Sequence, residues 1–288
     1  MKNRKNKLWI ILCSVALVVV LVSVLVMSRY SDIYVYVQNK GWFREAVDIE
    51  KSGTGVVSMD IGEAREDNRF EFNQSLLLVN RQYMLSDEFI AESSEYKDST
   101  VYMNTCIQDA YESLSHAVLE KTGKKLYVSS SIRGREEQEE LYLKDPLTAT
   151  IPGASEHETG LALDVYVARF AGDGFLKSPA GRFVNSHAHE YGFIMRYPSY
   201  GEQSTKIRFE PWHVRYVGFP HSNIIYGNSI TLEEYIEMLT PEVVYESQGY
   251  LILRTQPENG KINVPEGCES YVVSPDNTGY YIVTGKMR

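Results

Sequence analysis

The chain has 288 residues, 43% of them hydrophobic, and a formal net charge of −9 at pH 7. Its first 29 residues hold five basic and no acidic side chains, which leaves 24 basic against 38 acidic residues, a net charge of −14, in the remainder. This acidic balance argues against a nucleic-acid partner, because phosphate binding needs a basic surface. With only three cysteines the chain has no disulfide framework, although Cys106 and Cys268 could pair in an oxidising compartment.

An unbroken apolar run near the amino terminus predicts a membrane-spanning helix. Residues 8–27 contain no charged side chain and match one crossing of a bilayer in length. Four basic residues precede the run and only Arg29 follows it closely, so the positive-inside rule places the amino terminus in the cytoplasm. A cleaved signal peptide is the alternative, but the run exceeds the usual ~7–15 residues and lacks a small-residue cleavage site. We therefore expect residues 1–29 to form a cytoplasmic tail and a single-pass anchor in the cell membrane, with the carboxyl-terminal domain outside the cytoplasm.

The segment after the predicted anchor differs in composition from the rest of the chain. Residues 30–74 combine aromatic alternation at residues 33–37 with an acidic stretch at residues 63–71, and we expect a juxtamembrane stalk with one or two strands. A compact apolar run at residues 75–80 then marks the start of the main domain. We expect this domain to span residues 75–241.

Three regular elements are predicted in the first half of the main domain. Apolar residues recur at helical spacing between residues 107 and 118, and Gly123 supplies a natural stop. Residues 126–130 indicate a strand. Residues 135–144 indicate a charged helix that Pro146 ends.

The main domain is expected to end in a capped helix, followed by a region of strands and turns. Residues 231–239 are amphipathic, and Thr231 with Glu234 can form a capping box. Beyond them, strands are expected over residues 243–246, 250–254, 271–273 and 280–283. We expect residues 242–288 to form a small all-β appendage, which is too small to be stable unless it packs on the main domain.

Two short segments contain candidate metal ligands. The first, S-E-H-E-T-G-L-A-L-D at residues 155–164, offers His157 and Asp164, and the second, F-E-P-W-H at residues 209–213, offers His213. Three protein ligands that leave a fourth position open are typical of a catalytic zinc site, whereas a structural zinc site usually has four. Each of these side chains alone is more often an ordinary surface or core residue, so the prediction depends on their combination.

Metal binding requires the chain to bend between His157 and Asp164. Atoms that ligate one zinc ion lie only roughly 3.4 Å apart, whereas seven residues span ~10 Å in a helix and ~23 Å in a strand. Gly160 can supply the bend. Apolar residues then alternate along residues 161–167, which predicts a strand with one buried face and with Asp164 on the other.

Glu210 is the candidate general base. Pro211 separates it from His213 and favours a rigid turn, because proline has a fixed φ and no backbone donor. A carboxylate beside the metal can take a proton from the attacking water and later give it to the leaving amine. Glu158 is not assigned this role, because the helical H-E-x-x-H pattern fails at Leu161.

These segments resemble the zinc D,D-carboxypeptidases of the VanY type, a metallopeptidase family that also includes the VanX dipeptidases. The family pattern S-x-H-x-x-G-x-A-x-D matches residues 155–164 in full, and E-P-W-H matches residues 210–213. The resemblance implies one zinc ion per chain, with Glu210 as the general base. The implied zinc ligands are His157, Asp164 and His213.

A third segment extends the resemblance to the substrate pocket. The family has an S-G-Y-R-S-x-x-E-Q-like stretch, and residues 130–138 read S-S-I-R-G-R-E-E-Q. By this resemblance Arg133 is catalytic, stabilising either the oxyanion or the terminal carboxylate of the substrate. The residues implied to bind substrate are Arg133, Ser155, Gln138 and Trp212. Ile132 and Gly134 replace the usual Tyr and Ser of this pattern, and Arg135 adds a second guanidinium two residues from Arg133.

The resemblance implies an α+β zinc peptidase domain, in which helices flank a central antiparallel sheet, between the transmembrane helix and the β appendage. The implied activity is removal of a carboxyl-terminal D-Ala, D-lactate or D-Ser from stem peptides or lipid-linked precursors of peptidoglycan, in support of glycopeptide resistance. Such an enzyme forms no acyl intermediate and should resist β-lactams. An L,D-carboxypeptidase or a wall endopeptidase with the same zinc core is the near alternative. A non-catalytic wall-binding module is the alternative from another class.

Overall fold

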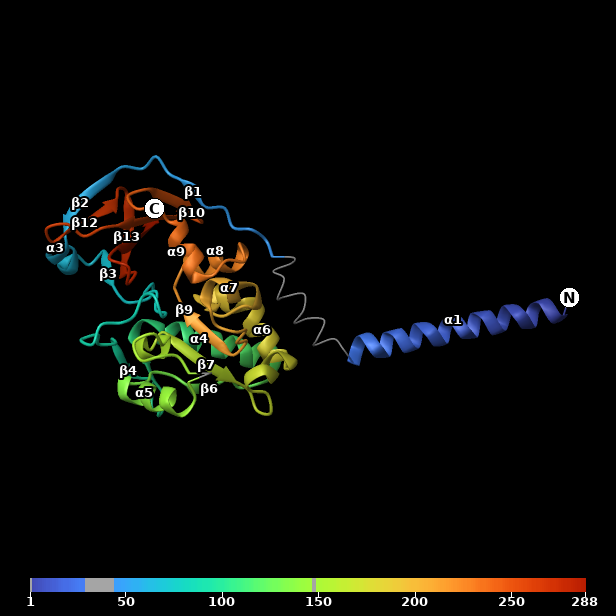
Figure 1. Ribbon diagram of the computed structural model, residues 1–288. Coiled ribbons are helices and arrows are strands. Elements are labelled where there is room, and N and C mark those ends of the chain that lie inside the picture. The colour runs from blue at the N-terminus through green and yellow to red at the C-terminus, as the bar shows by residue number, and fades with distance from the viewer. Residues whose placement is uncertain (1, 29–43, 147–148) are drawn as a thin grey trace. The chain divides into compact units, whose positions relative to one another are not determined.

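The computed structural model describes residues 2–28, 44–146 and 149–288 and divides after Trp42 into two units (Figure 1). The first unit contains the helix α1, Lys2–Ser28, with side chains described for residues 13–26. Within the described part of the chain, no helix is both long and apolar enough to cross a membrane. The anchor expected at residues 1–29 stays a prediction, and residues 30–43 of the expected stalk lie outside the described residues.

A four-stranded antiparallel sheet in the order β6-β7-β9-β8 lies at the centre of the second unit. The four strands, in that order, are Tyr127–Ser130, Ala162–Tyr166, His213–Tyr216 and Phe193–Met195. In this sheet Asp164 is paired with Ser130 on one side and with His213 on the other. Strand pairing therefore makes two candidate ligands from distant segments direct neighbours.

Helices α4 (Gln108–Thr122) and α6 (Pro179–His187) cover one face of this sheet. The side chains of β7 and its flanks that face them are each at most 1% exposed: Leu161, Leu163, Val165 and Val167. This confirms the predicted strand and its buried face. Helix α4 ends at Gly123, in a left-handed conformation, and α5 (Arg135–Lys144) has the predicted bounds. The architecture is thus α+β, with a central antiparallel sheet and flanking helices.

A tight turn leads into β7 at the predicted bend. The 3-10 helix Glu156–Thr159 ends at Gly160, whose φ of +69° lies in the left-handed region. A Cβ at this position would lie 2.8 Å from the backbone nitrogen of Asn104, which itself donates a hydrogen bond to the Gly160 carbonyl. The close approach of the two backbones therefore requires glycine here.

The apolar run at residues 75–80 is buried, as expected at the start of a domain, but it forms no strand or helix. Its backbone is held by side chains from distant parts of the chain. Arg215 donates to the carbonyls of Ser75 and Leu77, and Asn277 donates to the carbonyl of Leu78. These bonds satisfy carbonyl groups that a buried irregular segment would otherwise leave unpaired.

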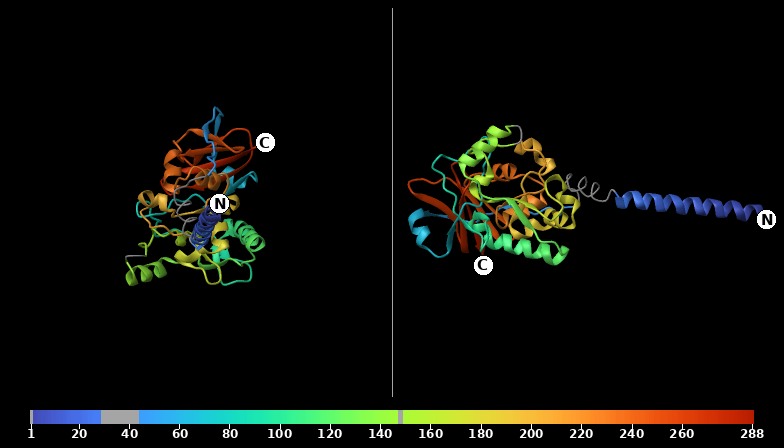
Figure 2. Two further views of the ribbon diagram at one scale, coloured as in Figure 1. Left: turned by 90° about the vertical axis from the view of Figure 1, so that its right-hand side faces the viewer. Right: turned by 90° about the horizontal axis from the view of Figure 1, so that it is seen from below.

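A second β structure joins the carboxyl-terminal strands to residues 50–72. Its six-stranded sheet has the order β1-β10-β11-β14-β13-β3, and β2 pairs separately with β12. The strands are β1 Glu50–Lys51, β2 Val56–Asp60, β3 Phe70–Phe72, β10 Val244–Ser247, β11 Tyr250–Thr255, β12 Lys261–Pro265, β13 Cys268–Pro275 and β14 Tyr281–Met287. Figures 1 and 2 show the amino-terminal strands beside the carboxyl-terminal ones.

This pairing corrects the prediction for the described part of the stalk. Residues 44–74 are not a separate linker, because three of their strands pair with strands from the predicted appendage. The short helix α3, Ile61–Glu66, lies between two of those strands. The appendage of residues 242–288 is therefore part of a larger β structure that begins near residue 50.

Short helices connect this β structure to the main domain. They are α8 His221–Gly227 and α9 Leu232–Met238. The helix α7 Glu202–Thr205 and a hairpin of β4 Ser93–Glu95 and β5 Tyr102–Asn104 also belong to the unit. The predicted capping box of Thr231 and Glu234 is present. Apolar side chains of α8 and α9 share one core with Ile252 and Ile282 of the large sheet, so the β structure packs on the main domain. Cys106 and Cys268 are both free.

Candidate active site

The three predicted metal ligands converge in space. One ligand atom from each of His157, Asp164 and His213 lies within 4.8 Å of the other two. Pairing of β7 with β9 places Asp164 beside His213, and the turn that ends at Gly160 brings His157 back to them. The imidazole rings of His157 and His213 lie edge to face with their centroids 5.0 Å apart.

The contacts of the two histidines determine which nitrogens face the shared space. His157 Nδ1 lies 2.8 Å from the carbonyl oxygen of Ser131, which can only accept, so Nδ1 carries the proton and Nε2 is free to ligate. His213 Nδ1 lies 3.0 Å from Asp164 Oδ1. Two imidazoles and a carboxylate whose ligand atoms lie this close together fit a zinc ion.

The charges of the ligand groups also suit a metal ion. Burial alone would raise the pKa of Asp164, but its contacts with both histidines outweigh burial and hold that pKa well below its ordinary value. Burial lowers the pKa of His157. Asp164 is therefore ionised and His157 neutral at pH 7, which are the forms that bind metals. Burial lowers the pKa of His213, but Asp164 and Glu156 raise it to about 9, so His213 loses a proton when it binds a metal.

Glu210 lies beside the ligands and is not one of the three converging groups. Its backbone N–H donates to the Tyr197 carbonyl at 3.0 Å, and its own carbonyl accepts from the His213 N–H at 3.2 Å across Pro211. The side chain is 20% exposed, and burial raises the pKa of its carboxyl group. A partly buried carboxylate with a raised pKa is suited to accept and return a proton.

Arg133 is half-buried and is held by side chains of its own segment. Its Nε and Nη2 donate to the Ser130 hydroxyl at 3.2 and 3.0 Å, and its Nη1 donates to Gln138 Oε1 at 2.9 Å. Gln138 is 1% exposed and also donates to the Thr150 carbonyl. The structure thus shows Gln138 orienting Arg133, and direct contact of Gln138 with substrate stays a prediction.

The second guanidinium of this segment, Arg135, is used within the fold. It donates to Glu158 Oε2 at 3.0 Å, to the carbonyls of Leu85 and Ser86, and to Asp87. Glu158 in turn accepts from the Gly153 N–H at 2.6 Å. Arg135 therefore orders the loop in front of the first ligand segment.

Ser155 and Trp212 lie next to ligand residues in the chain. Ser155 is buried, and its carbonyl accepts from the N–H of Glu158. Trp212 packs against the main core, and the guanidinium of Arg208 lies 5.4 Å above its ring. These positions suit a wall near the ligands, while contact of either side chain with substrate stays a prediction.

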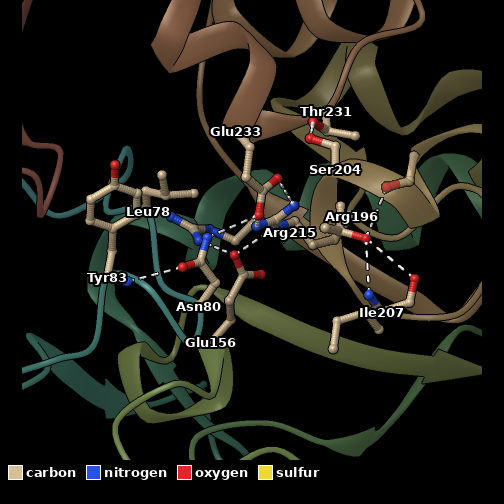
Figure 3. Close-up of polar contacts among 12 residues, drawn as sticks. Leu78, Asn80, Tyr83, Glu156, Arg196, Ser204, Ile207, Arg215, Thr231 and Glu233 are labelled. Carbon is tan, nitrogen blue, oxygen red and sulfur yellow. Dashed lines mark hydrogen bonds and ion pairs between the residues drawn. The ribbon is translucent and has the colours of Figure 1, made fainter.

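Sequence reasoning missed a buried ion-pair network behind His213. Glu156 Oε1 accepts from Arg196 Nε at 2.7 Å and from Arg215 Nη1 at 2.8 Å, and Arg196 also pairs with Glu233 of α9 (Figure 3). Burial would raise the pKa of Glu156, but the two arginines hold it well below its ordinary value. The only local signal was an acid next to His157, and nothing in the sequence indicated that distant arginines would meet it.

Comparisons with known proteins agree with this geometry. The family model VanY, described as D-alanyl-D-alanine carboxypeptidase, matches residues 100–219. A D-alanyl-D-alanine carboxypeptidase of Enterococcus faecium is 31% identical over 258 residues, which cover 82% of each chain.

Two solved structures are also similar. The vancomycin-resistance D,D-dipeptidase VanXYg, solved with a D-Ala-D-Ala phosphinate analogue, has 27% identity and a TM-score of 0.64, covering 82% of this chain and all of that one. A mutant of the D,D-pentapeptidase VanY from a VanB-type resistance cassette, solved with Zn(II), has 28% identity and a TM-score of 0.51, covering 56% of this chain and 98% of that one.

The geometry predicts different metal contents for a ligand variant and a base variant. His157→Ala should weaken zinc binding by more than about 100-fold, which exceeds the usual loss when only the hydrogen-bond partner of a ligand is removed. Glu210→Gln should retain zinc, because its carboxylate is not among the converging groups. Competitive titration with a zinc chelator measures both. His116→Ala, at an exposed position of α4, is the control, and zinc loss in Glu210→Gln would contradict its assignment as base.

Proposed function

Because the chain belongs to the VanY family of D-alanyl-D-alanine carboxypeptidases, we propose that it is a zinc-dependent D,D-carboxypeptidase acting on peptidoglycan stem peptides. The observation that carries this proposal is the convergence of His157, Asp164 and His213 with Glu210 beside them. The substrate is a pentapeptide stem, free or on a lipid-linked precursor, and the product is its terminal D-residue.

Each side chain has a defined part in the reaction. His157, Asp164 and His213 would hold the zinc ion, which would supply a Lewis acid for the scissile carbonyl and for the attacking water. Glu210 accepts a proton from that water and delivers it to the leaving amine. The turn at Pro211 keeps the Glu210 carboxylate near the ligands without joining them, so the base stays available for proton transfer.

Arg133 recognises the negative charge of the substrate. It is the guanidinium that family resemblance assigns to this role, and Ser130 with Gln138 holds it in one orientation. A preorganised guanidinium can bind a carboxylate or stabilise an oxyanion without reorganisation during the reaction.

A release assay tests the proposed activity. The wild-type chain should release D-Ala from an L-Ala-D-Glu-L-Lys-D-Ala-D-Ala peptide, and chelation of zinc or Glu210→Gln should each lower kcat by at least about 100-fold. Amino-acid analysis identifies the released residue, and peptides ending in D-lactate and D-Ser measure the preference among termini. Vancomycin susceptibility of cells that express wild type or Glu210→Gln tests the proposed support of glycopeptide resistance.

The same assay separates the alternatives. Release of D-Ala only from the tetrapeptide would replace the proposal with an L,D-carboxypeptidase, and cleavage only of crosslinked wall would replace it with an endopeptidase. Full activity in Glu210→Gln after zinc removal would contradict the mechanism. If the protein bound to the cell wall but hydrolysed none of these substrates, it would be a non-catalytic wall-binding module.

The role of Arg133 predicts a change in discrimination against substrates without a terminal charge. Arg133→Ala should lower kcat/KM for the pentapeptide by about 10–100-fold, because a charge-assisted contact is lost. It should lower kcat/KM much less for a peptide whose carboxyl terminus is amidated. Equal losses of kcat/KM on both peptides would indicate that Arg133 stabilises the oxyanion instead. No loss on either peptide would show that Arg133 has no part in substrate binding or catalysis. Arg135→Ala, which should mainly reduce stability, is the matched control.

We also propose that the enzyme is a single-pass membrane protein with its peptidase domain outside the cytoplasm. The uncharged run at residues 8–27 and the basic residues before it support this arrangement. An anchor would keep the enzyme close to precursors exported across the same membrane. The full chain should then remain in the membrane fraction with its amino terminus intact, whereas a chain without residues 1–29 should be soluble. Recovery of a shortened, soluble wild-type chain would favour a cleaved signal peptide.

A further inference from the structure

Two buried polar atoms behind the metal ligands lack hydrogen-bond partners. Among the described residues, only three buried side-chain nitrogen or oxygen atoms have none, and two of these are Glu156 Oε2 and His213 Nε2. These two atoms face each other at 3.6 Å. A buried polar atom without a hydrogen-bond partner lowers the stability of the fold. A carboxylate oxygen can accept from a protonated imidazole nitrogen, so a small shortening of this distance would form a hydrogen bond between the two atoms.

The carboxylate of Glu156 is fixed so that only Oε2 can reach His213. Its other oxygen, Oε1, accepts from both Arg196 and Arg215. Both guanidinium groups are at most 1% exposed, and Glu156 itself is 1% exposed. The carboxylate therefore has no solvent to turn toward, and no other side chain or backbone group of the described residues donates to Oε2.

The two arginines are themselves anchored to separate parts of the fold. Arg196 makes a bidentate pair with Glu233 of α9, at 2.7 and 2.6 Å. Arg215 donates to the carbonyls of Ser75 and Leu77. Figure 3 shows the two guanidinium groups between Glu156 and Glu233. This arrangement fixes the position of Glu156 more firmly than a single ion pair could.

The opposite side of the His213 ring faces the metal ligands. Nδ1 lies 3.0 Å from Asp164 Oδ1, so this nitrogen points into the group that converges on the metal. A neutral imidazole carries one proton, and the nitrogen without it is the metal ligand. A group that accepts a hydrogen bond from the Nε2 proton therefore keeps that proton on Nε2 and leaves Nδ1 free to bind the metal.

From these contacts we propose that Glu156 is a positioning residue of the metal site: its Oε2 accepts the Nε2 proton of His213 and so keeps Nδ1 free to bind zinc. The inference rests on the proposed zinc function, and it assigns a role to a residue that is only 1% exposed. It also explains why Arg196 and Arg215 are buried: they hold the Glu156 carboxylate in position to form a hydrogen bond with the metal ligand His213.

Zinc affinity and the proton position on His213 test the proposal in the full chain in detergent. Glu156→Gln should weaken zinc binding by about 10–100-fold, because the amide can donate to Nε2 and so favour the His213 form with its proton on Nδ1. Glu233→Gln is the matched control, since it removes a carboxylate from the same network without touching His213. Its zinc affinity should equal that of wild type even if its stability falls.

Histidine ¹⁵N spectroscopy reads the proton position directly. In the zinc-loaded wild type, the His213 signals, assigned by their loss in His213→Gln, should show a protonated Nε2 and a metal-bound Nδ1. A proton on Nδ1 in the wild type overturns the proposal. Equal losses of zinc affinity in Glu156→Gln and Glu233→Gln also overturn it, because they would indicate general destabilisation.

These outcomes can be separated from failure of the proposed function. A wild-type chain that binds no zinc overturns both the function and the role of Glu156. A chain that binds zinc through His213 Nδ1 but hydrolyses no peptide supports the role of Glu156 and overturns the proposed activity alone.

Discussion

The register between β7 and β9 is the constraint on which the site depends. Residues directly opposite each other in an antiparallel pair have Cβ atoms about 4.5–5.5 Å apart, so pairing Asp164 with His213 brings two ligands together through backbone hydrogen bonds alone. A slip of one residue would turn Asp164 to the face that packs on α4 and α6. The buried side chains of Leu163 and Val165 on that face oppose such a slip. The third ligand, His157, then needs only the short turn that Gly160 permits.

Behind the paired strands β7 and β9, the protein buries several charged side chains that pair with one another. Glu156, Arg196 and Arg215 are almost completely inaccessible, and Glu233 is mostly buried. Buried ion pairs contribute little net stability, because the cost of desolvation offsets much of the attraction. They do fix geometry, since breaking one leaves an uncompensated buried charge. The network connects α9, the segment at residues 75–79 and the strand that carries His213. It therefore fixes the positions of these three elements relative to one another.

Features that depend on local residue order were predictable from sequence. Gly160 marked the bend, the capping box of Thr231 marked the start of α9, and the apolar alternation marked β7, because each signal lies within a few residues. The pairing of residues 50–72 with the carboxyl-terminal strands was not predictable. Those segments lie about 200 residues from their partners, and β1 and most of β2 are exposed, so they lack the alternation of a half-buried strand. The three converging candidate ligands followed from a motif, whereas Glu156 occupied a variable position within it.

The two acids that flank His157 show how the motif is held in place. Glu156 reaches inward to Arg196 and Arg215, while Glu158 reaches to Arg135 and to the backbone of Gly153. Both carboxylates are therefore committed to cations from other segments, so neither is free to act as the general base. The turn that presents His157 is fixed on both sides by ion pairs. Glu210, the proposed general base, approaches from a separate turn and has no guanidinium closer than Arg208, 4.0 Å away, among the ion pairs of the described residues.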